Sequence, residues 1–323
     1  MCCLYGLMDP KLILSGREKS RLMHNLATAA EERGTDAAGY ALNRGGRLAI
    51  YKRPIPGHKL HFRIRDETVA VTGHNRLTTQ GNAALNYNNH PFPGVCGGTR
   101  FALAHNGVLH NDAELRREKR LPNTMVETDS FVAVQLLETK QSLDFAGLRY
   151  MTEQIRGTFT FTVLTEDNIL YIVKGDNPMH LYYFRRSGLY VYASTQTVAG
   201  YAVGRAKYLS EKPEEIPLYC GDILKIEPSG KIRRERFNDS HLLAEDWIGY
   251  GWPYRQQGAL HRREPMSLWD QYFENLRMFA VSEGFDPKMV DRLVNSCISL
   301  SEIEDYLYEA GAYGNDGLYQ MEQ

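Results

Sequence analysis

The pattern of apolar and polar positions predicts a layered domain that begins with a buried strand. Residues 2–8 are almost entirely apolar, which is typical of a strand covered on both faces. Residues 11–33 carry apolar side chains at helical spacing, and a glycine follows as a stop signal. Two strand-like runs come next, at 37–42 and 48–52, and the Asn43–Gly46 segment between them predicts a hairpin turn.

The rest of the first 237 residues changes from strands to helices and back to strands. Strands are predicted at 68–72 and 101–104, running into the polar stretches Gly73–Arg76 and His105–Gly107. Helices are predicted at 113–120, 129–138, 145–155 and 195–203, and strands at 159–164, 169–173, 181–184, 189–193, 223–226 and 232–236. This order lacks the strict alternation of a doubly wound fold. It favours an α+β domain of stacked antiparallel sheets with helices outside.

The pattern changes after Phe237, so the first domain is predicted to span residues 2–237. Residues 238–264 are rich in aromatic residues, glycine and arginine and are predicted to be an irregular linker. Residues 265–312 contain three short helical patterns and are predicted to form a small helical appendage, and 313–323 a frayed tail. Ser301 with Glu304 marks the start of the third helix as a capping box.

Composition narrows the possible function classes. The chain is 43% hydrophobic and 24% charged, and its net charge of -1 gives no reason to expect a nucleic-acid or membrane partner. Five cysteines without CxxC spacing argue against a disulfide framework and a zinc ribbon, and favour a reducing compartment. Without a signal-peptide pattern or a long apolar run, we expect a cytoplasmic protein. We expect no metal and no cofactor.

Cys2 is the first candidate for chemistry. Removal of Met1 would place a thiol and an α-amine on the same residue. The amine, with an ordinary pKa of about 7.7–8.0, can accept the proton of the thiol, directly or through water. A cysteine at position 2 is by itself usually only a cysteine, so the assignment depends on residues further along the chain.

Four polar clusters occur at or near the predicted strand and helix ends. They are Gly73–Gly81 with Arg76 and Thr79, Asn88–Pro91 with His90, His105–Gly107 with Asn106, and Glu127–Asp129. Each has an ordinary explanation, because Asn-Gly is common in turns and Thr-Asp before a helix is common as a cap.

In this order, and after a cysteine at position 2, the clusters resemble a class II glutamine amidotransferase domain. These are glutaminases of the N-terminal-nucleophile hydrolase type, found in glucosamine-6-phosphate synthase, amidophosphoribosyltransferase and asparagine synthetase. The resemblance runs from Cys2 to about Arg236 and includes Arg33–Gly39, which is similar to the family's RGxDSAG stretch. It implies a four-layer α-β-β-α sandwich of two antiparallel sheets, here with a small helical C-terminal appendage.

The resemblance implies the catalytic roles. Cys2 would attack the side-chain amide carbon of L-glutamine, release ammonia and form a thioester that water hydrolyses to glutamate. The Asn106 side-chain amide and the Gly107 backbone N–H would form the oxyanion hole.

It also implies the substrate-binding roles. Arg76 and Thr79 would bind the α-carboxylate, because a guanidinium matches a carboxylate in a two-point contact. Asp129 would pair with the α-ammonium. Arg33 would contact the backbone or amine of the cysteine. His90 lies in a matching motif, and a structural role is favoured for it over that of a general base.

Four positions depart from the family pattern. Cys3 stands where a glycine is usual, and we expect it to be a small buried residue. Leu77 and Gln80 replace a tryptophan and a histidine in the loop expected to close over glutamine. Thr195 replaces an acid.

Three functions are compatible with these observations. About 85 residues follow the glutaminase region, which is short for a synthase domain of roughly 100–200 residues. We therefore expect a glutaminase that passes ammonia to a separate synthase partner. The alternatives are a hydrolase of another γ-glutamyl amide or peptide, and a catalytically silent glutamine-binding module. The ammonia acceptor and the formation of a homo-oligomer are left open.

Overall fold

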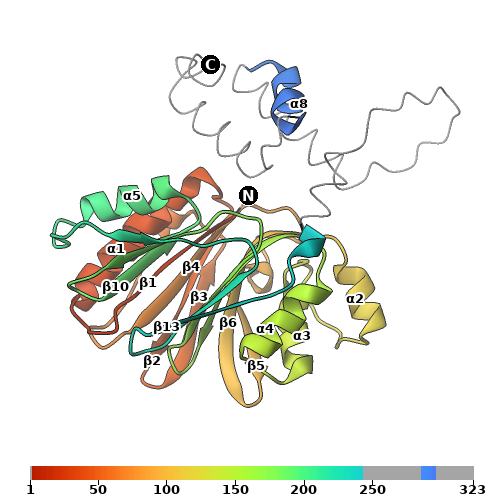
Figure 1. Ribbon diagram of the computed structural model, residues 1–323, viewed down its shortest axis with the longest axis horizontal. Helices are drawn as coiled ribbons and strands as arrows, with labels where there is room; N and C mark the ends of the chain where they lie inside the picture. Colours follow the sequence, from red (N-terminus) through yellow and green to blue (C-terminus); the bar gives the residue numbers. More distant parts are fainter. Residues whose placement is uncertain (1, 243–284, 296–323) are drawn as a thin grey trace, which may run out of the picture. The chain divides into compact units, whose positions relative to one another are not determined.

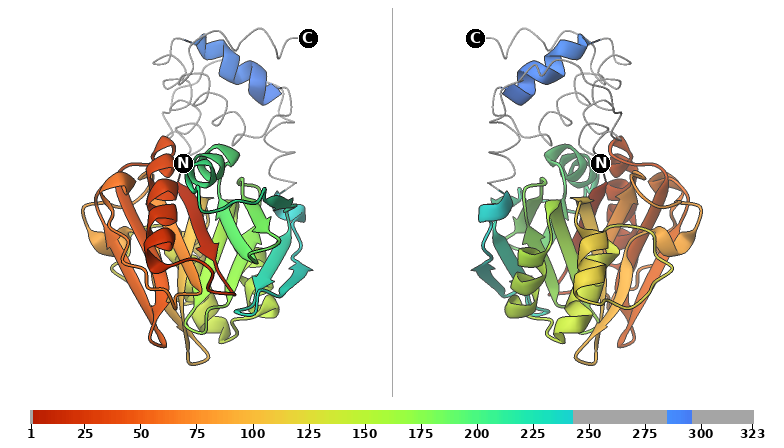
Figure 2. Two further views of the ribbon diagram at one scale, coloured as in Figure 1. Left: turned by 90° about the vertical axis from the view of Figure 1, so that its left-hand side faces the viewer. Right: turned by 90° about the vertical axis from the view of Figure 1, so that its right-hand side faces the viewer.

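Two antiparallel sheets stacked face to face, with helices on both outer faces, form the body of the structure (Figure 1). The computed structural model describes residues 2–242 and 285–295. The chain divides into two compact units, Met1–Leu242 and Leu243–Gln323. The α-β-β-α sandwich predicted from the sequence is confirmed, and it lies in the first unit (Figure 2).

The first sheet has seven strands and carries the N-terminal strand at its centre. Their order is β11 (Glu214–Ile216), β9 (His180–Phe184), β10 (Leu189–Ala193), β1 (Cys3–Met8), β4 (Ala70–Arg76), β2 (Ala37–Arg44) and β3 (Arg47–Arg53). Helices α1 (Gly16–Ala29) and α5 (Gln196–Arg205) cover its outer face (Figure 1). Short 3₁₀ turns lie at Ala30–Glu32 and Gly57–Lys59.

The second sheet has six strands. Their order is β13 (Ile232–Arg236), β12 (Asp222–Ile226), β8 (Leu170–Lys174), β7 (Gly157–Thr165), β6 (Thr99–Leu109) and β5 (Phe92–Cys96). Helices α3 (Phe131–Lys140) and α4 (Phe145–Gln154) cover its outer face, and α2 (Asp112–Glu118) contacts α3. A 3₁₀ turn at Asn86–Asn88 precedes β5. In the second unit, the structure describes helix α8 (Pro287–Asn295).

The alternation of side chains along the strands separates the core between the sheets from the cores under the helices. On β1, Leu4 faces the layer between the sheets, whereas Tyr5 packs under α1 and α5. On β4, Ala70 faces the inter-sheet layer and Val71 the helices. The side chains at even-numbered positions of β1 and β4 therefore point into the space between the two sheets. The same holds for the even-numbered positions of β6 up to Ala104.

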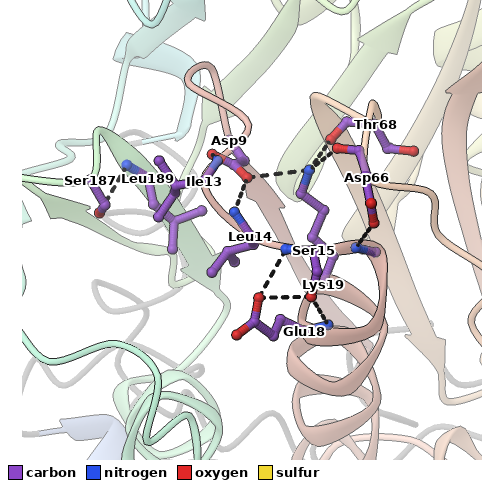
Figure 3. Close-up of polar contacts among 11 residues, drawn as sticks. Asp9, Ile13, Leu14, Ser15, Glu18, Lys19, Asp66, Thr68, Ser187 and Leu189 are labelled. Atoms are coloured by element: carbon purple, nitrogen blue, oxygen red, sulfur yellow. Dashed lines mark hydrogen bonds and ion pairs between the residues drawn. The ribbon is translucent and has the colours of Figure 1, made fainter.

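A buried ion pair ties the end of β1 to α1 and to the segment before β4 (Figure 3). Lys19 Nζ lies 3.2 Å from Asp9 Oδ2, and both side chains are fully buried. Lys19 also donates to the carbonyl oxygens of Asp66 and Thr68, at 2.7 and 2.8 Å, so all three of its donors are used. Asp9 accepts two backbone N–H groups of the turn before α1, at 3.1 and 3.0 Å. Every polar atom of the pair is thus satisfied without water.

The structure differs from the sequence predictions mainly at element ends. The stretch Gly73–Arg76 forms the last four residues of β4, and His105–Gly107 lies inside β6, so both strands extend beyond their predicted ends as ladder partners of β1 and β7. Strands β5 and β11 were not predicted. The first helix begins at Gly16, not at Lys11, because Ser15 and Glu18 form a capping box there.

Other predictions concern the C-terminal part of the chain. Helix α8 corresponds to the second of the three helical patterns predicted after Pro265. The linker 238–264 is described only to Leu242, and the first and third helical patterns and the tail 313–323 lie outside the described residues. The domain boundaries remain predictions.

The substitution Lys19→Met tests the buried ion pair. It leaves the Asp9 carboxylate without its cation and two backbone carbonyls without a donor. We expect a loss of about 3–5 kcal/mol in the free energy of unfolding, measured by urea titration. The control Lys59→Met changes an exposed lysine and should stay within about 0.5 kcal/mol of the unaltered protein. A loss for Lys19→Met as small as that of the control would contradict the structural role of the pair.

Candidate active site

The predicted nucleophile and two of its predicted partners lie at one end of the inter-sheet layer. The pairing of β1 with β4 sets Cys3 opposite Asn75, and one further step in the same register sets Cys2 opposite Arg76. Asn106 lies on the facing strand β6, two positions beyond the inter-sheet residue Ala104. Three segments far apart in the sequence therefore meet at this point.

A narrow cavity of about 10 Å³ opens beside Cys2. Its lining residues are Cys2, Arg76, Leu77, Thr79, Gln80, His90, His105, Gly107, Thr128, Asp129 and Ser130. Six of the eight residues predicted from the sequence to form the site are in this set. Of the other two, Arg33 contacts Cys2, and Asn106 is adjacent to Gly107 in sequence. The space holds about one water molecule, so the cavity must widen before it can take an amino acid.

Two hydrogen bonds hold Cys2 in place. The Arg33 Nε donates to the Cys2 carbonyl oxygen at 3.2 Å, and the Cys2 thiol donates to the Leu77 carbonyl oxygen at 3.5 Å. Burial raises the pKa of the Cys2 thiol, and the nearby Arg76 opposes that shift. The neighbouring Cys3 points the other way, into the core under α1, and burial raises its pKa to about 12. Cys2 is the thiol that faces the cavity.

The predicted oxyanion-hole residues lie side by side on β6. Asn106 is fully buried, and neither atom of its side-chain amide has a hydrogen-bond partner among the described residues. A buried amide without partners costs free energy, so it is expected where a ligand will supply the missing bond. At Gly107 the φ angle is 144°, and an added Cβ would lie 2.0 Å from the Thr158 carbonyl oxygen. The backbone can take this course only with glycine.

Arg76 is buried and held by its own loop. Its Nη1 donates to Asn89 Oδ1 at 2.7 Å, and its Nη2 donates to the Gln80 carbonyl oxygen at 2.5 Å. Burial lowers the pKa of the guanidinium, while Cys2 and Asp129 raise it. The strand position of Arg76 depends on Gly34, because a Cβ at Gly34 would lie 2.5 Å from the Arg76 carbonyl carbon.

Asp129 lines the same cavity and brings a negative charge to it. Its Oδ2 accepts the Leu109 backbone N–H at 2.6 Å, and its Oδ1 accepts the Ser130 hydroxyl at 3.3 Å. The same hydroxyl lies 2.8 Å from His105 Nδ1. Burial raises the pKa of Asp129, and the backbone hydrogen bonds from Leu109 and Ser130 oppose that shift.

Three buried histidines lie beside the cavity. The rings of His74 and His90 are 4.2 Å apart, and His90 lies 4.3 Å from the ring of Phe92. His74 Nε2 lies 3.0 Å from the His105 carbonyl oxygen. Burial lowers the pKa of His74 and His105 to about 3 and that of His90 well below its ordinary value. All three rings are therefore neutral near pH 7, and none carries charge to a substrate.

Sequence reasoning missed several residues that line or support the cavity. Ser130 is adjacent in sequence to Asp129, which is the only signal that could have found it, whereas His105 belongs to a polar cluster that the sequence already indicated. Asn89 is adjacent to His90, but its bond to Arg76 depends on how the loop folds. In the part of the chain that the structure describes, no group of three or more His, Cys, Asp or Glu side chains is arranged to hold a metal ion.

Comparison with known proteins assigns a family to the central part of the chain. Residues 74–199 match a family described as a glutamine amidotransferase domain. The chain contains a glutamine amidotransferase domain. The matched segment of this domain includes Arg76, His90, Asn106 and Asp129, and it begins after Cys2.

The curated relatives of the amidotransferase domain are longer proteins. A glutamine–fructose-6-phosphate aminotransferase from Bacillus thuringiensis subsp. konkukian is 31% identical over 192 residues, which cover 55% of this chain and 30% of that protein. The enzyme of the same name from Halobacterium salinarum is 29% identical over 167 residues, covering 50% of this chain and 27% of that protein. The chain thus spans less than a third of the length of these relatives.

Two solved structures share the fold. A glutamine phosphoribosylpyrophosphate amidotransferase from B. subtilis has a TM-score of 0.56 at 20% identity, over 73% of this chain and 49% of that chain. A structure titled as the allosteric regulatory enzyme of purine biosynthesis has a TM-score of 0.59 at 17% identity, over 88% and 59%. At these identities the likeness concerns the fold alone. No helix among residues 2–242 and 285–295 is long and apolar enough to cross a membrane.

The neutral histidines lead to a prediction for how the free energy of unfolding depends on pH. An unfolded histidine binds a proton below about pH 6.5, whereas folded His74 and His105, with a pKa of about 3, do not until about pH 3, and burial also keeps the pKa of His90 well below its ordinary value. The unfolded state therefore binds more protons in this window. The free energy of unfolding should fall as the pH drops from about 6.5 toward 3, by up to about 1.4 kcal/mol per pH unit for each histidine.

The substitution His90→Phe checks the origin of this slope. Urea titrations at several pH values give the slope of the unfolding free energy against pH. For His90→Phe this slope should correspond to about one proton fewer than for the unaltered protein. Phe92→Leu is the control, since it changes the packing against His90 but removes no titrating group, and it should keep the slope. An equal slope for His90→Phe and the unaltered protein would show that His90 binds its proton over the same pH range in the folded state as in the unfolded state.

Proposed function

We propose that this chain is a class II glutaminase, an amide hydrolase that converts L-glutamine to glutamate and ammonia through a thioester on Cys2. The observation that carries the proposal is the set of chemical groups that line one cavity. A thiol, a buried cation and a buried carboxylate line it together, beside an amide side chain without partners among the described residues. Free glutamine offers a complement to each of these groups.

The two charged residues that line the cavity suit the head group of a free amino acid. Arg76 would bind the α-carboxylate, with Thr79 beside it, and Asp129 would bind the α-ammonium. Both charged residues are buried, so their attraction for a substrate is screened less than at an exposed site. Fixing both charged groups on the α-carbon would position the side-chain amide of the substrate at Cys2.

The chemistry then follows from the groups around Cys2. With Met1 removed, the α-amine takes the thiol proton as the sulfur attacks the amide carbon. The negative charge that develops on the amide oxygen is met by the Asn106 side-chain N–H and the Gly107 backbone N–H. When the C–N bond breaks, the amine returns the proton to the leaving nitrogen, which departs as ammonia. Water attacks the thioester, with the amine again as base, and gives glutamate and the free thiol.

The ammonia is proposed to pass to a separate synthase. The curated relatives are named as aminotransferases of fructose-6-phosphate, and this chain matches less than a third of their length. The names of these relatives support transfer of the ammonia to an acceptor. A reducing, cytoplasmic location belongs to the same proposal, because the reaction needs a free thiol. Cys2, Cys3, Cys96 and Cys220 are all free in the structure.

The first test of this proposal is the mass of the full chain before and after exposure to diazo-oxo-norleucine. We expect loss of Met1 and one covalent adduct on Cys2, together with release of glutamate and ammonia from L-glutamine. Cys2→Ala should abolish both the adduct and the turnover. Cys3→Ala is the matched control and should keep both, because Cys3 faces the core under α1. Turnover that persists in Cys2→Ala would refute the assignment of the nucleophile.

The substitution Asn106→Ala tests the oxyanion hole. It removes one donor to the developing oxyanion, so kcat for glutamine should fall by about 10²–10³. The KM should change little, because the donor acts mainly in the transition state. Steady-state kinetics on glutamine measure both constants. A raised KM with an unchanged kcat would instead indicate that Asn106 binds the ground state of the substrate.

A further inference from the structure

Two adjacent asparagines, Asn88 and Asn89, lie in the segment between β4 and β5, and the proposed mechanism does not use them. They are 0% and 1% exposed. Asn89 accepts from Arg76 Nη1 at 2.7 Å and donates to the Ala83 carbonyl oxygen at 2.8 Å. Asn89 thereby fixes the direction of the guanidinium against the loop.

Asn88 makes a two-point contact with Glu127. Its Nδ2 donates to Glu127 Oε2 at 2.7 Å, and its Oδ1 accepts the Glu127 backbone N–H at 2.9 Å. Glu127 also accepts the Asn82 backbone N–H at 3.3 Å. Glu127 stands two residues before Asp129, so the contact joins the loop of one charged residue to the segment of the other.

The two asparagines thus connect the two charges of the cavity through a short path. Arg76 is held by Asn89, the adjacent Asn88 is bonded at two points to Glu127, and Asp129 follows in the chain. The path is made of side-chain amides and one carboxylate with defined donors and acceptors. A change in the Asn88–Glu127 contact would therefore alter the spacing between Arg76 and Asp129 more than it would alter the position of Cys2.

We infer that Asn88 and Glu127 are positioning residues that set the separation of Arg76 and Asp129, and so select substrates with a free α-amino acid head group. This inference rests on the proposed glutaminase function and deepens it. Neither residue is assigned a contact with the substrate. They act through the cation and the carboxylate that bind it.

The donor and acceptor pattern allows an isosteric test with a rescue. Asn88→Asp replaces the Nδ2 donor by an oxygen that faces Glu127 Oε2, so attraction becomes repulsion without loss of volume. Glu127→Gln keeps an oxygen that can accept from Asn88, so its effect should be smaller than that of Asn88→Asp. When both substitutions are combined, the new amide at position 127 can donate to the new carboxylate at position 88, which should restore part of the contact.

The readout compares two reagents that both alkylate Cys2. Diazo-oxo-norleucine carries an α-ammonium and an α-carboxylate, whereas iodoacetamide carries neither. Asn88→Asp should slow the first reaction about ten- to hundredfold, as expected when a buried hydrogen bond is lost, and leave the second within about threefold. The double variant should recover about tenfold of the loss, and the KM for glutamine should follow the same order.

Asn43→Asp is the matched control. It makes the same charge change in the β2–β3 turn, where Asn43 Oδ1 accepts the Gly46 backbone N–H at 2.9 Å, and should slow neither reaction. If Asn88→Asp slowed both reactions equally, or slowed neither, this inference would be overturned. The proposed function would be unaffected by that result. An unaltered chain that iodoacetamide labels and diazo-oxo-norleucine does not would overturn the proposed function, and this inference with it.

Discussion

The antiparallel pairing of β1 with β4 is the constraint on which the site depends. This pairing places the start of the chain beside the end of β4, where Arg76 lies. The alternation of side chains then decides which of the two adjacent cysteines faces the space between the sheets. A slip of one residue would turn Cys2 toward the helices and Cys3 toward the cavity. The buried Asp9–Lys19 pair secures the other end of β1 and so resists such a slip.

Burial governs the charges of the site in two ways. It leaves the three histidines neutral, so the charged side chains that line the cavity are Arg76 and Asp129. It also makes these two charges costly, and each is compensated by fixed partners: carbonyl and amide oxygens for Arg76, backbone and hydroxyl donors for Asp129. The partners hold the two side chains in position before any ligand arrives. Such preorganisation is what a site for a small charged molecule requires.

Much of the fold could be predicted from the sequence because its signals are local, such as the apolar run of β10 and the Thr195 cap of α5. The placement of polar motifs could not. His74 and Asn106 were expected where strands end, but they lie within strands because each faces a buried site that the partner sheet completes. The charged site residues could be assigned from their order and a family resemblance. Their supports, Asn88 and Asn89, belong to a polar cluster visible in the sequence, but their bonds act across 13 to 39 residues, and no local pattern predicts those bonds.

The departures from the family pattern are explained by the groups that make the contacts. Leu77 and Gln80 differ in side chain, yet their contacts with Cys2 and Arg76 are made by backbone carbonyl oxygens. Thr195 stands where an acid is usual, and its hydroxyl caps α5 and donates to Glu32 at 2.9 Å, so a carboxylate is still present. A backbone contact survives any side chain that keeps the local fold. The contacts that Leu77 and Gln80 make with Cys2 and Arg76 therefore do not depend on the side chains that differ.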